Sequence, residues 1–370
     1  MEEKISILEQ VLKPLFKEDL KLTDIKITGL GTFLPGNPIT NKEMETVMGV
    51  REDWIEKMIG NTSRYYAVNF QEKTVEYDLI DLCEKAALKA FENSSLESLN
   101  EIDLIVLSTA TPDHLMPATV NLLADRLGLQ GIPTYQIQAG CSGALQGLDV
   151  AQQFLKANSY KNALVVGGDV CNKYMDLNRD FKKLRSSELI NYLLFGDGAG
   201  AAILSKNTEE PGFKLIEIFN QFEGLNREPA QVMNWLGNIP SDVQGMSSRQ
   251  ISKKYPSAKE DYKSIEKHVP QLTKEMFYTL LEQNNWEKDD VDHFLPPQLG
   301  WHMTKKIIEY TDLDYKKTTN CVKETGNNGN ALPYVQLSQL STKVKENDKI
   351  VGVAIESSKW IKTGFVLQYV

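Results

Sequence analysis

Residues 135–145 read Tyr-Gln-Ile-Gln-Ala-Gly-Cys-Ser-Gly-Ala-Leu, and this stretch decides how the chain folds. A strand-like run ends in a Gly-Cys-Ser-Gly turn, and an apolar helical pattern follows at once, which places the Cys141 thiol at the N-terminus of a helix. The partial positive charge and free backbone N–H groups at that end favour a thiolate. We therefore expect a lowered thiol pKa and a cysteine nucleophile that carries an acyl group. A buried structural cysteine is the alternative that this segment alone leaves open.

The order of elements around this stretch occurs twice along the chain. In each half a helix, an apolar strand, a glycine-rich turn, a second helix and a second strand follow one another. The first half has them at 76–88, 103–107, 139–143, about 144–155 and 163–169. The second half has them at 271–281, 292–295, 326–330, about 331–344 and 349–355. This alternation predicts an α/β fold with mostly parallel sheets, in which two pseudo-symmetric halves form a five-layered α-β-α-β-α core.

The repeat also predicts the boundaries and the position of the site. We expect an amphipathic helical extension at 1–22, a first half at 23–206 and a second half at 207–370, with an irregular insertion at about 207–264. A pseudo-twofold axis brings the turn at 326–330 face to face with the Cys141 turn, so a polar amide is expected near the sulfur. The glycine-rich segment 194–204 lacks the lysine of a phosphate loop, which favours a tight turn beside the site.

The composition narrows the class of protein. Of 370 residues, 41% are hydrophobic and 25% are charged, as in soluble globular proteins, and the net charge of −9 argues against nucleic acid or an anionic membrane as a partner. Four scattered cysteines and four histidines without ligand spacing predict no metal site and a reducing, cytoplasmic location. The acidic N-terminus and the lack of a long apolar run predict neither a signal peptide nor a membrane span.

Taken together, these motifs resemble a thiolase-superfamily condensing enzyme of the β-ketoacyl-acyl carrier protein synthase III type, over about residues 25–370. Residues 139–143 match that family's nucleophile motif, and Phe-Gly-Asp-Gly-Ala-Gly at 195–200 matches its signature. The resemblance implies a thiolase-like fold in which Cys141 takes an acyl group from a thioester and a second nucleophile then attacks it. It also implies an oxyanion hole of backbone N–H groups near the cysteine, and Asn327 falls on the family's asparagine.

The resemblance further implies substrate contacts and partners. Trp54, in the sequence Glu-Asp-Trp-Ile, corresponds to the residue that stacks against the adenine of coenzyme A. Met116 falls where the family reaches into the acyl pocket of a partner subunit, so a homodimer is expected. Phe195 and Ser142, from the two matched motifs, are the other expected substrate contacts. Acyl-coenzyme A and acyl carrier protein are the expected partners, and their thioester is a substrate, so no separate cofactor is expected.

Two departures from the family pattern bear on the chemistry. Pro297, in Pro-Pro-Gln at 296–298, stands where the family has its catalytic histidine, and proline neither donates a hydrogen bond nor acts as a base. The family's glycine-rich stretch near the C-terminus reads Ile-Glu-Ser-Ser-Lys-Trp-Ile-Lys at 355–362. His302, five residues beyond Pro297, is a candidate catalytic residue nearer the tunnel mouth.

Three functions are consistent with the sequence. The first is an acyltransferase that forms an acyl-thioester on Cys141 and passes the group to a carbon, oxygen or nitrogen nucleophile in fatty-acid, polyketide or specialised-metabolite biosynthesis. The second is an ordinary decarboxylative β-ketoacyl synthase with a displaced base, His302 or Glu324. The third is a non-catalytic subunit that pairs with an active paralogue, which the retained cysteine argues against.

Overall fold

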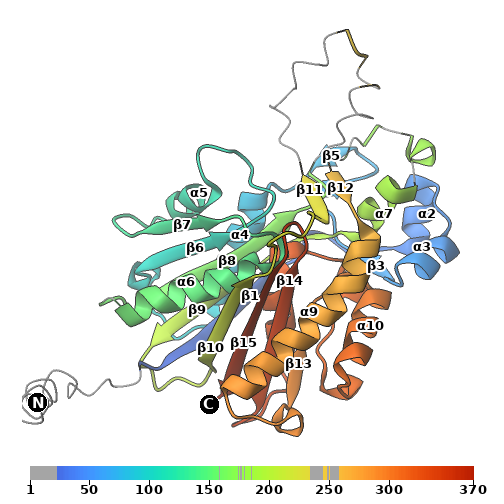
Figure 1. Ribbon diagram of the computed structural model, residues 1–370. Helices are drawn as coiled ribbons and strands as arrows, with labels where there is room; N and C mark the ends of the chain where they lie inside the picture. Colours follow the sequence, from blue (N-terminus) through green and yellow to red (C-terminus); the bar gives the residue numbers. More distant parts are fainter. Residues whose placement is uncertain are drawn as a thin grey trace, which may run out of the picture.

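The computed structural model describes residues 23–370 apart from 158, 174, 176, 179, 185, 234–244, 248, 249 and 251–257. The predicted helical extension at 1–22 lies outside the described residues. The fold is built on a mixed nine-stranded sheet in the order β13-β14-β15-β10-β1-β9-β8-β6-β7, with helices around it (Figure 1). None of the helices in the described part of the chain combines the length and apolar character needed to cross a membrane.

The strand order repeats, as the duplication in the sequence predicted. The N-terminal half-sheet runs β1 (Ile25–Phe33), β9 (Asp197–Lys206), β8 (Asn162–Val170), β6 (Leu104–Ser108) and β7 (Thr134–Ile137). The C-terminal half-sheet runs β10 (Phe213–Phe222), β15 (Ile361–Tyr369), β14 (Lys349–Glu356) and β13 (His293–Leu295). A parallel bridge from Phe294 to Thr318 takes the place of the β6–β7 pairing, so both halves share one topology. The halves join where β1 pairs with β10, at Lys26–Lys214 and Ile27–Phe213.

The prediction of mostly parallel sheets is wrong in part. Each half has two parallel pairings at its outer edge, but β8–β9, β9–β1, β14–β15 and β15–β10 are antiparallel. In the second half the reason is local. Only residues 357–360 separate β14 from β15, and a connection this short joins antiparallel neighbours, whereas parallel strands need a long crossover.

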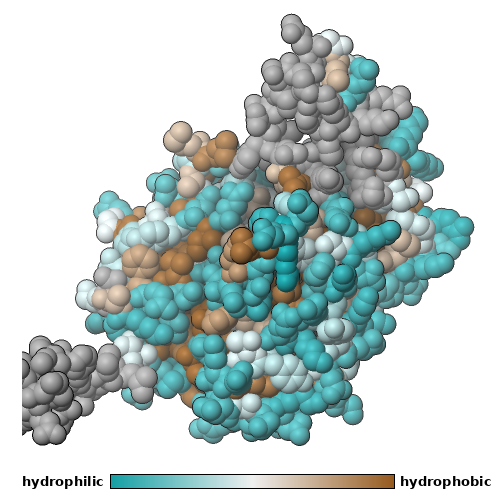
Figure 2. Space-filling model, in the orientation of Figure 1, coloured by the Kyte–Doolittle hydropathy of each residue, from teal (hydrophilic) through white to brown (hydrophobic). Residues whose placement is uncertain are grey.

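Five layers result from packing helices on and between the half-sheets. Helices α6 (Gly143–Ala157) and α12 (Leu332–Ser341) share one apolar core with strands of both halves and form the middle layer. Helices α4 (Leu79–Glu92) and α5 (Thr119–Arg126) cover the outer face of the N-terminal half-sheet. Helices α9 (Tyr262–Gln283) and α10 (Trp301–Thr311) cover that of the C-terminal half-sheet, where the surface over α9 is mainly hydrophilic (Figures 1 and 2).

Smaller elements gather at the end of the core where the site lies. They include helices α2 (Asn41–Met48), α3 (Glu52–Met58), α7 (Ser186–Leu194) and α11 (Val322–Thr325). Four short strands, β2 (Ile39–Thr40), β3 (Ser63–Arg64), β4 (Val68–Asn69) and β5 (Thr74–Val75), pair as two ribbons. Apolar side chains of α2, α3 and α7 form a cluster separate from the main core, which includes Met44, Ile55 and Leu193.

The predicted irregular insertion at 207–264 is wrong over much of its described length. It contains β10, a ten-residue strand near the centre of the sheet, and a ribbon of β11 (Gln231–Met233) with β12 (Ala258–Glu260). Phe213 and Leu215 of β10 are buried, but the strand ends in exposed Asn-Gln-Phe. Because this end is exposed, its residues do not continue the apolar pattern with which the strand begins.

Candidate active site

The turn between β7 and α6 places Cys141 at a helix N-terminus, as predicted. A single 3-10 turn at Gly140–Ser142 leads directly into α6. Gly140 has a φ of 48°, in the left-handed region that favours glycine. A Cβ atom at Gly140 would also collide with the carboxylate of Glu356. Conformation and space therefore both require glycine directly before Cys141.

Glu356 lies against the predicted nucleophile. It is the last residue of β14 and is 2% exposed. Its Oε2 accepts a hydrogen bond from the backbone N–H of Cys141, and its Oε1 accepts one from the backbone N–H of Ser358 at 2.6 Å. The departure from the family's glycine-rich stretch thus places a carboxylate on an N–H group that the resemblance assigned to the oxyanion hole.

This environment reverses the expected acidity of the thiol. Burial, followed by the charge of Glu356, raises the pKa of Cys141 well above its ordinary value. The predicted lowering is wrong because the helix N-terminus is buried and because its first N–H group already has an acidic partner. Burial raises the pKa of Glu356 as well. The thiol of Cys141 is therefore protonated at neutral pH, and acylation requires removal of its proton.

The second glycine-rich turn lies opposite Cys141, as the pseudo-twofold axis predicted. Asn327 lines the same cavity as Cys141 and is bridged to Phe195 by backbone hydrogen bonds, with Gly196 N–H donating to Asn327 O at 3.0 Å. Asn327 Oδ1 accepts from Gly329 N–H at 3.1 Å, which fixes the orientation of the amide. The segment after Leu194 is therefore a tight turn beside the site, as its sequence indicated.

Asp169, near the end of β8, ties the turn at 326–330 to the segment 109–111 that follows β6, and it was not predicted. It is 2% exposed, and its Oδ2 accepts from the backbone N and Nδ2 of Asn330 at 2.9 and 2.8 Å. Its Oδ1 accepts from Ala110 N at 2.8 Å and from the hydroxyls of Thr109 and Thr111, each at 3.1 Å. The sequence does contain a signal for this residue, because Asp169 is the one carboxylate near the end of an otherwise apolar strand.

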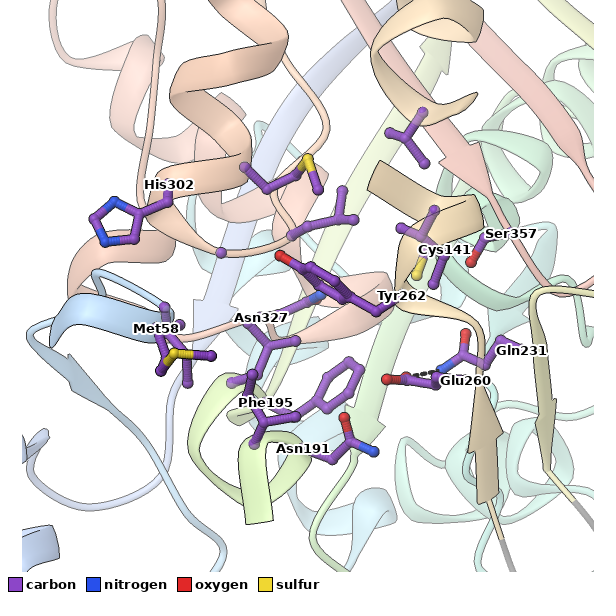
Figure 3. Close-up of a pocket in the computed structure, with 18 of the residues that line it drawn as sticks. Met58, Cys141, Asn191, Phe195, Gln231, Glu260, Tyr262, His302, Asn327 and Ser357 are labelled. Atoms are coloured by element: carbon purple, nitrogen blue, oxygen red, sulfur yellow. Dashed lines mark hydrogen bonds between the residues drawn. The ribbon is translucent and has the colours of Figure 1, made fainter. Parts of the chain in front are cut away.

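A cavity opens in front of Cys141 and Asn327 (Figure 3). Much of its wall is apolar and comes from α3, α7, α9 and α10, including Met58, Ile190, Leu194, Ile265, Val269 and Met303. Its other polar side chains are those of Asn191, Gln231, Glu260, Tyr262, His302 and Ser357. The arrangement is that of an apolar acyl-binding cavity with a few fixed polar groups near the predicted nucleophile.

Glu260 enters this cavity from the β11–β12 ribbon. Gln231 and Glu260 lie directly opposite each other in the register, and Gln231 Nε2 donates to Glu260 Oε1 at 2.8 Å (Figure 3). Burial raises the pKa of Glu260. Neither residue was predicted, because the surrounding sequence has no clear period.

The two candidates for a displaced base do not lie near Cys141. His302 lines the outer part of the cavity, but its Nε2 contacts the backbone O of Glu56 at 2.8 Å, and its ring points away from Cys141 (Figure 3). Glu324 is exposed on α11 and is not among the described residues that line the cavity. Pro297 is buried two residues after the end of β13. The structure therefore gives neither residue the position of the missing histidine.

The remaining predicted contacts differ in outcome. Phe195 lines the cavity. Ser142 is fully buried, its hydroxyl donates to Ala139 O at 2.9 Å, and it accepts from Gln146 Nε2 at 2.8 Å, so the predicted substrate contact is replaced by a role within the turn. Trp54 is partly buried on α3, one turn from Met58, and Met116 is 87% exposed. Their contacts with coenzyme A and with a partner subunit stay predictions.

Comparison with known proteins identifies the family. The models of 3-oxoacyl-[acyl-carrier-protein] synthase III and of its C-terminal part match residues 135–224 and 281–357. The β-ketoacyl-[acyl-carrier-protein] synthase III of Oceanobacillus iheyensis is 30% identical over 332 residues, which cover 89% of this chain and 94% of that protein. The chain belongs to the 3-oxoacyl-[acyl-carrier-protein] synthase III family. This synthase III-type protein is accordingly a condensing, acyl-transferring enzyme.

Solved structures agree with this assignment. A tetronic acid condensing enzyme superposes with a TM-score of 0.86 at 39% identity, over 93% of this chain and 99% of its own. The 3-oxoacyl-(acyl carrier protein) synthase III of Pseudomonas aeruginosa superposes with a TM-score of 0.77 at 22% identity, over 94% of this chain and 98% of its own. This synthase III-type protein therefore has the thiolase fold that the sequence predicted.

Proposed function

We propose that this protein is a condensing acyltransferase that works without decarboxylation. Cys141 accepts an acyl group from a thioester of coenzyme A or acyl carrier protein and passes it to the α-carbon of a β-ketoacyl thioester. The observation that carries this proposal is Pro297, which is buried at the position of the family's histidine. A proline there can neither donate to a thioester carbonyl nor accept a proton.

A β-ketoacyl acceptor can react without the family's histidine. A malonyl acceptor becomes nucleophilic only as carbon dioxide leaves, and the charge that develops on its thioester oxygen then needs hydrogen-bond donors. The α-carbon of a β-ketoacyl thioester lies between two carbonyl groups, so one base can generate the carbanion and no carboxylate has to leave. The Nδ2 group of Asn327, oriented by the bond from Gly329 N–H to Oδ1, is the donor we assign to the acceptor carbonyl.

The relative with 39% identity supports this substrate class. A tetronic acid is a five-membered lactone that contains a 1,3-dicarbonyl unit, so its assembly from two thioesters needs one C–C bond and one ester bond. With an α-hydroxyacyl group on Cys141, the C–C bond to the acceptor forms as the C–S bond breaks. The hydroxyl then attacks the acceptor thioester, closes the ring and releases the carrier thiol. We therefore propose α-hydroxyacyl and β-ketoacyl thioesters as substrates, in polyketide or other specialised-metabolite biosynthesis.

Asn191 supports a hydroxyl-bearing acyl group. Its side chain lines the cavity (Figure 3), and its Oδ1 is buried and has no hydrogen-bond partner among the residues that the structure describes. A buried oxygen of this kind lowers stability unless a donor reaches it. The O–H group of an α-hydroxyacyl chain is such a donor.

The experiment follows the acyl group in two stages. Acyl-coenzyme A and acyl-carrier thioesters, among them lactoyl and acetyl, are incubated with the protein, and intact mass is expected to show one adduct on Cys141. The acylated protein, freed of donor, is then mixed with acetoacetyl-coenzyme A or malonyl-coenzyme A. We expect rapid C-acylation of the acetoacetyl thioester and slow consumption of the malonyl thioester.

Two results would contradict the proposal. Fast carbon dioxide release from malonyl-coenzyme A, coupled to acyl transfer, would identify an ordinary decarboxylative synthase. An absence of any adduct across the panel would instead favour the non-catalytic subunit.

A further inference from the structure

The acidic side chain that faces the cavity is Glu260. Among the described residues that line the cavity, it is the only carboxylate, and the other titratable groups there are those of Cys141, Tyr262 and His302. Figure 3 shows its carboxylate pointing from β12 into the cavity, on the side where Asn191 and Phe195 lie. Its location is fixed by the cross-strand bond from Gln231 Nε2 to Oε1, and no residue that the structure describes donates a hydrogen bond to Oε2.

The other titratable groups do not fit the role of a base. The ring of His302 points away from Cys141 and contacts the backbone of Glu56. Burial and two nearby carboxylates raise the pKa of Tyr262, so its hydroxyl stays protonated and serves as a donor. Glu356 contacts the backbone of Cys141 but is not among the cavity-lining residues that the structure describes. Glu260 and Cys141 are close enough for the charge of Glu260 to raise the thiol pKa.

We propose that Glu260 is the catalytic base of the acyl-transfer step, in place of the histidine that Pro297 replaces. The inference rests on the proposed function. The Glu260 carboxylate takes the proton from the α-carbon of the β-ketoacyl acceptor, and the carbanion attacks the acyl carbonyl on Cys141. The C–C bond forms as the C–S bond breaks, and Glu260 returns the proton to the sulfur. The step is redox-neutral, releases no carbon dioxide and restores both groups.

The environments of the two residues fit this proton transfer. A base is most effective when its affinity for the proton approaches that of the group it deprotonates. Burial raises the pKa of Glu260 and so brings its proton affinity closer to that of the α-carbon. The thiol of Cys141 also holds its proton strongly, so the departing thiolate readily takes the proton back. Because Gln231 is neutral, its hydrogen bond positions the carboxylate without adding a counter-charge.

The test separates proton removal from acyl transfer. Acetoacetyl-coenzyme A is incubated in D2O with the full-length protein and no acyl donor, and enzyme-dependent exchange of its α-protons is measured by NMR. In a second measurement, each variant is acylated to completion, checked by intact mass, and mixed with acetoacetyl-coenzyme A in a single turnover. The variants are Glu260→Gln, Glu260→Asp and the matched control Glu266→Gln, an exposed carboxylate of α9 that pairs with Lys306.

We expect Glu260→Gln to lower both exchange and transfer by ~10²–10⁴-fold, the usual contribution of a positioned base. Glu260→Asp should retain part of both rates, and Glu266→Gln should match the wild type. Far-ultraviolet circular dichroism and thermal melting identify any variant that fails to fold. If Glu260→Gln does not fold, the exchange and transfer rates of Glu260→Asp test the proposal instead. Wild-type exchange and transfer in Glu260→Gln would overturn this inference alone. If wild-type protein never acylates Cys141, the proposed function fails, and the exchange rate reports on Glu260 separately.

Discussion

The backbone N–H of Cys141 donates to the carboxylate of Glu356, a residue 215 positions later in the chain that is almost completely buried. The two residues belong to different copies of the repeat, since Cys141 precedes α6 and Glu356 ends β14. The contact places an acidic group where the negative charge of an acyl-transfer intermediate would otherwise be stabilised. After burial, the charge of this residue of the other half is the next largest cause that raises the pKa of the Cys141 thiol.

Glu356→Gln should make Cys141 more reactive at neutral pH. The neutral amide can still accept from the N–H, but it removes a negative charge that raises the thiol pKa, so the thiolate fraction at a given pH increases. The rate of iodoacetamide labelling measured against pH should reach half its maximum at a lower pH than in the wild type. In the wild type this midpoint should lie above the ordinary thiol value of about 8.5. An unchanged midpoint would show that Glu356 is uncharged beside the thiol.

Cys141→Ala should abolish covalent acylation. Cys83 is fully buried in the outer layer of the N-terminal half, and Cys171 is not among the cavity-lining residues that the structure describes. Cys83→Ala and Cys171→Ala should therefore keep the adduct seen by intact mass. An adduct that persists in Cys141→Ala would assign the acyl group to another residue.

The wild type should decarboxylate malonyl thioesters slowly. A positioned general acid or base contributes ~10²–10⁴-fold in rate, and Pro297 supplies none. Release of carbon dioxide from malonyl-coenzyme A should rise in Pro297→His. His302→Ala and Glu324→Ala serve as controls and should leave the slow rate unchanged. Fast release that disappears in either control would restore the displaced-base hypothesis.

Asp169→Asn should destabilise the fold and loosen the turn at 326–330. Asp169 accepts hydrogen bonds from Asn330 of this turn and from the segment 109–111, and an amide presents N–H groups to some of those donors. Leaving buried donors unsatisfied costs on the order of 2–4 kcal/mol in the free energy of unfolding. Urea denaturation measures the change. Asp149→Asn, at a half-buried position on α6, is the matched control and should alter stability by less than ~0.5 kcal/mol.

The protein should be a homodimer in solution. Leu115 and Met116 are 72% and 87% exposed, and β7, the edge strand of the sheet, carries the exposed Tyr135. Exposed apolar side chains and an open strand edge are each typical of a surface that a second subunit covers. Light scattering at micromolar concentration should give twice the chain mass, and Met116→Glu should weaken the dimer. A monomeric mass for the wild type would contradict this prediction.

The site could be predicted only where it follows the repeat. The turns that hold Cys141 and Asn327 were found because each precedes a helix at matching places in the two halves, and the family resemblance then singled out Asn327 within its turn. Glu356 stood in a visible departure from the family pattern, but the sequence alone could not give the direction of its side chain. Glu260 lies on a three-residue strand whose partner strand and register exist only in the folded protein.

The sign of the thiol pKa was wrong for a related reason. The helix N-terminus was read from local sequence, whereas burial and the carboxylates of Glu356, Asp169 and Glu260 come from tertiary contacts. The central strand β10 was missed because its exposed last residues do not continue the apolar pattern with which it begins. The local sequence pattern was thus enough to locate the predicted nucleophile, but the pKa of its thiol depends on residues that are distant in sequence.

The middle layer has a consequence for the evolution of this chain. Helix α6 packs on strands of both half-sheets, and the halves share one continuous apolar core. Neither half could bury α6 alone, so the two copies of the ancestral unit fold and unfold as one cooperative body. The strand order still shows the gene duplication, but the two halves can no longer fold separately. A substitution in one half therefore also affects the stability of the other, because both halves pack on the same central helices.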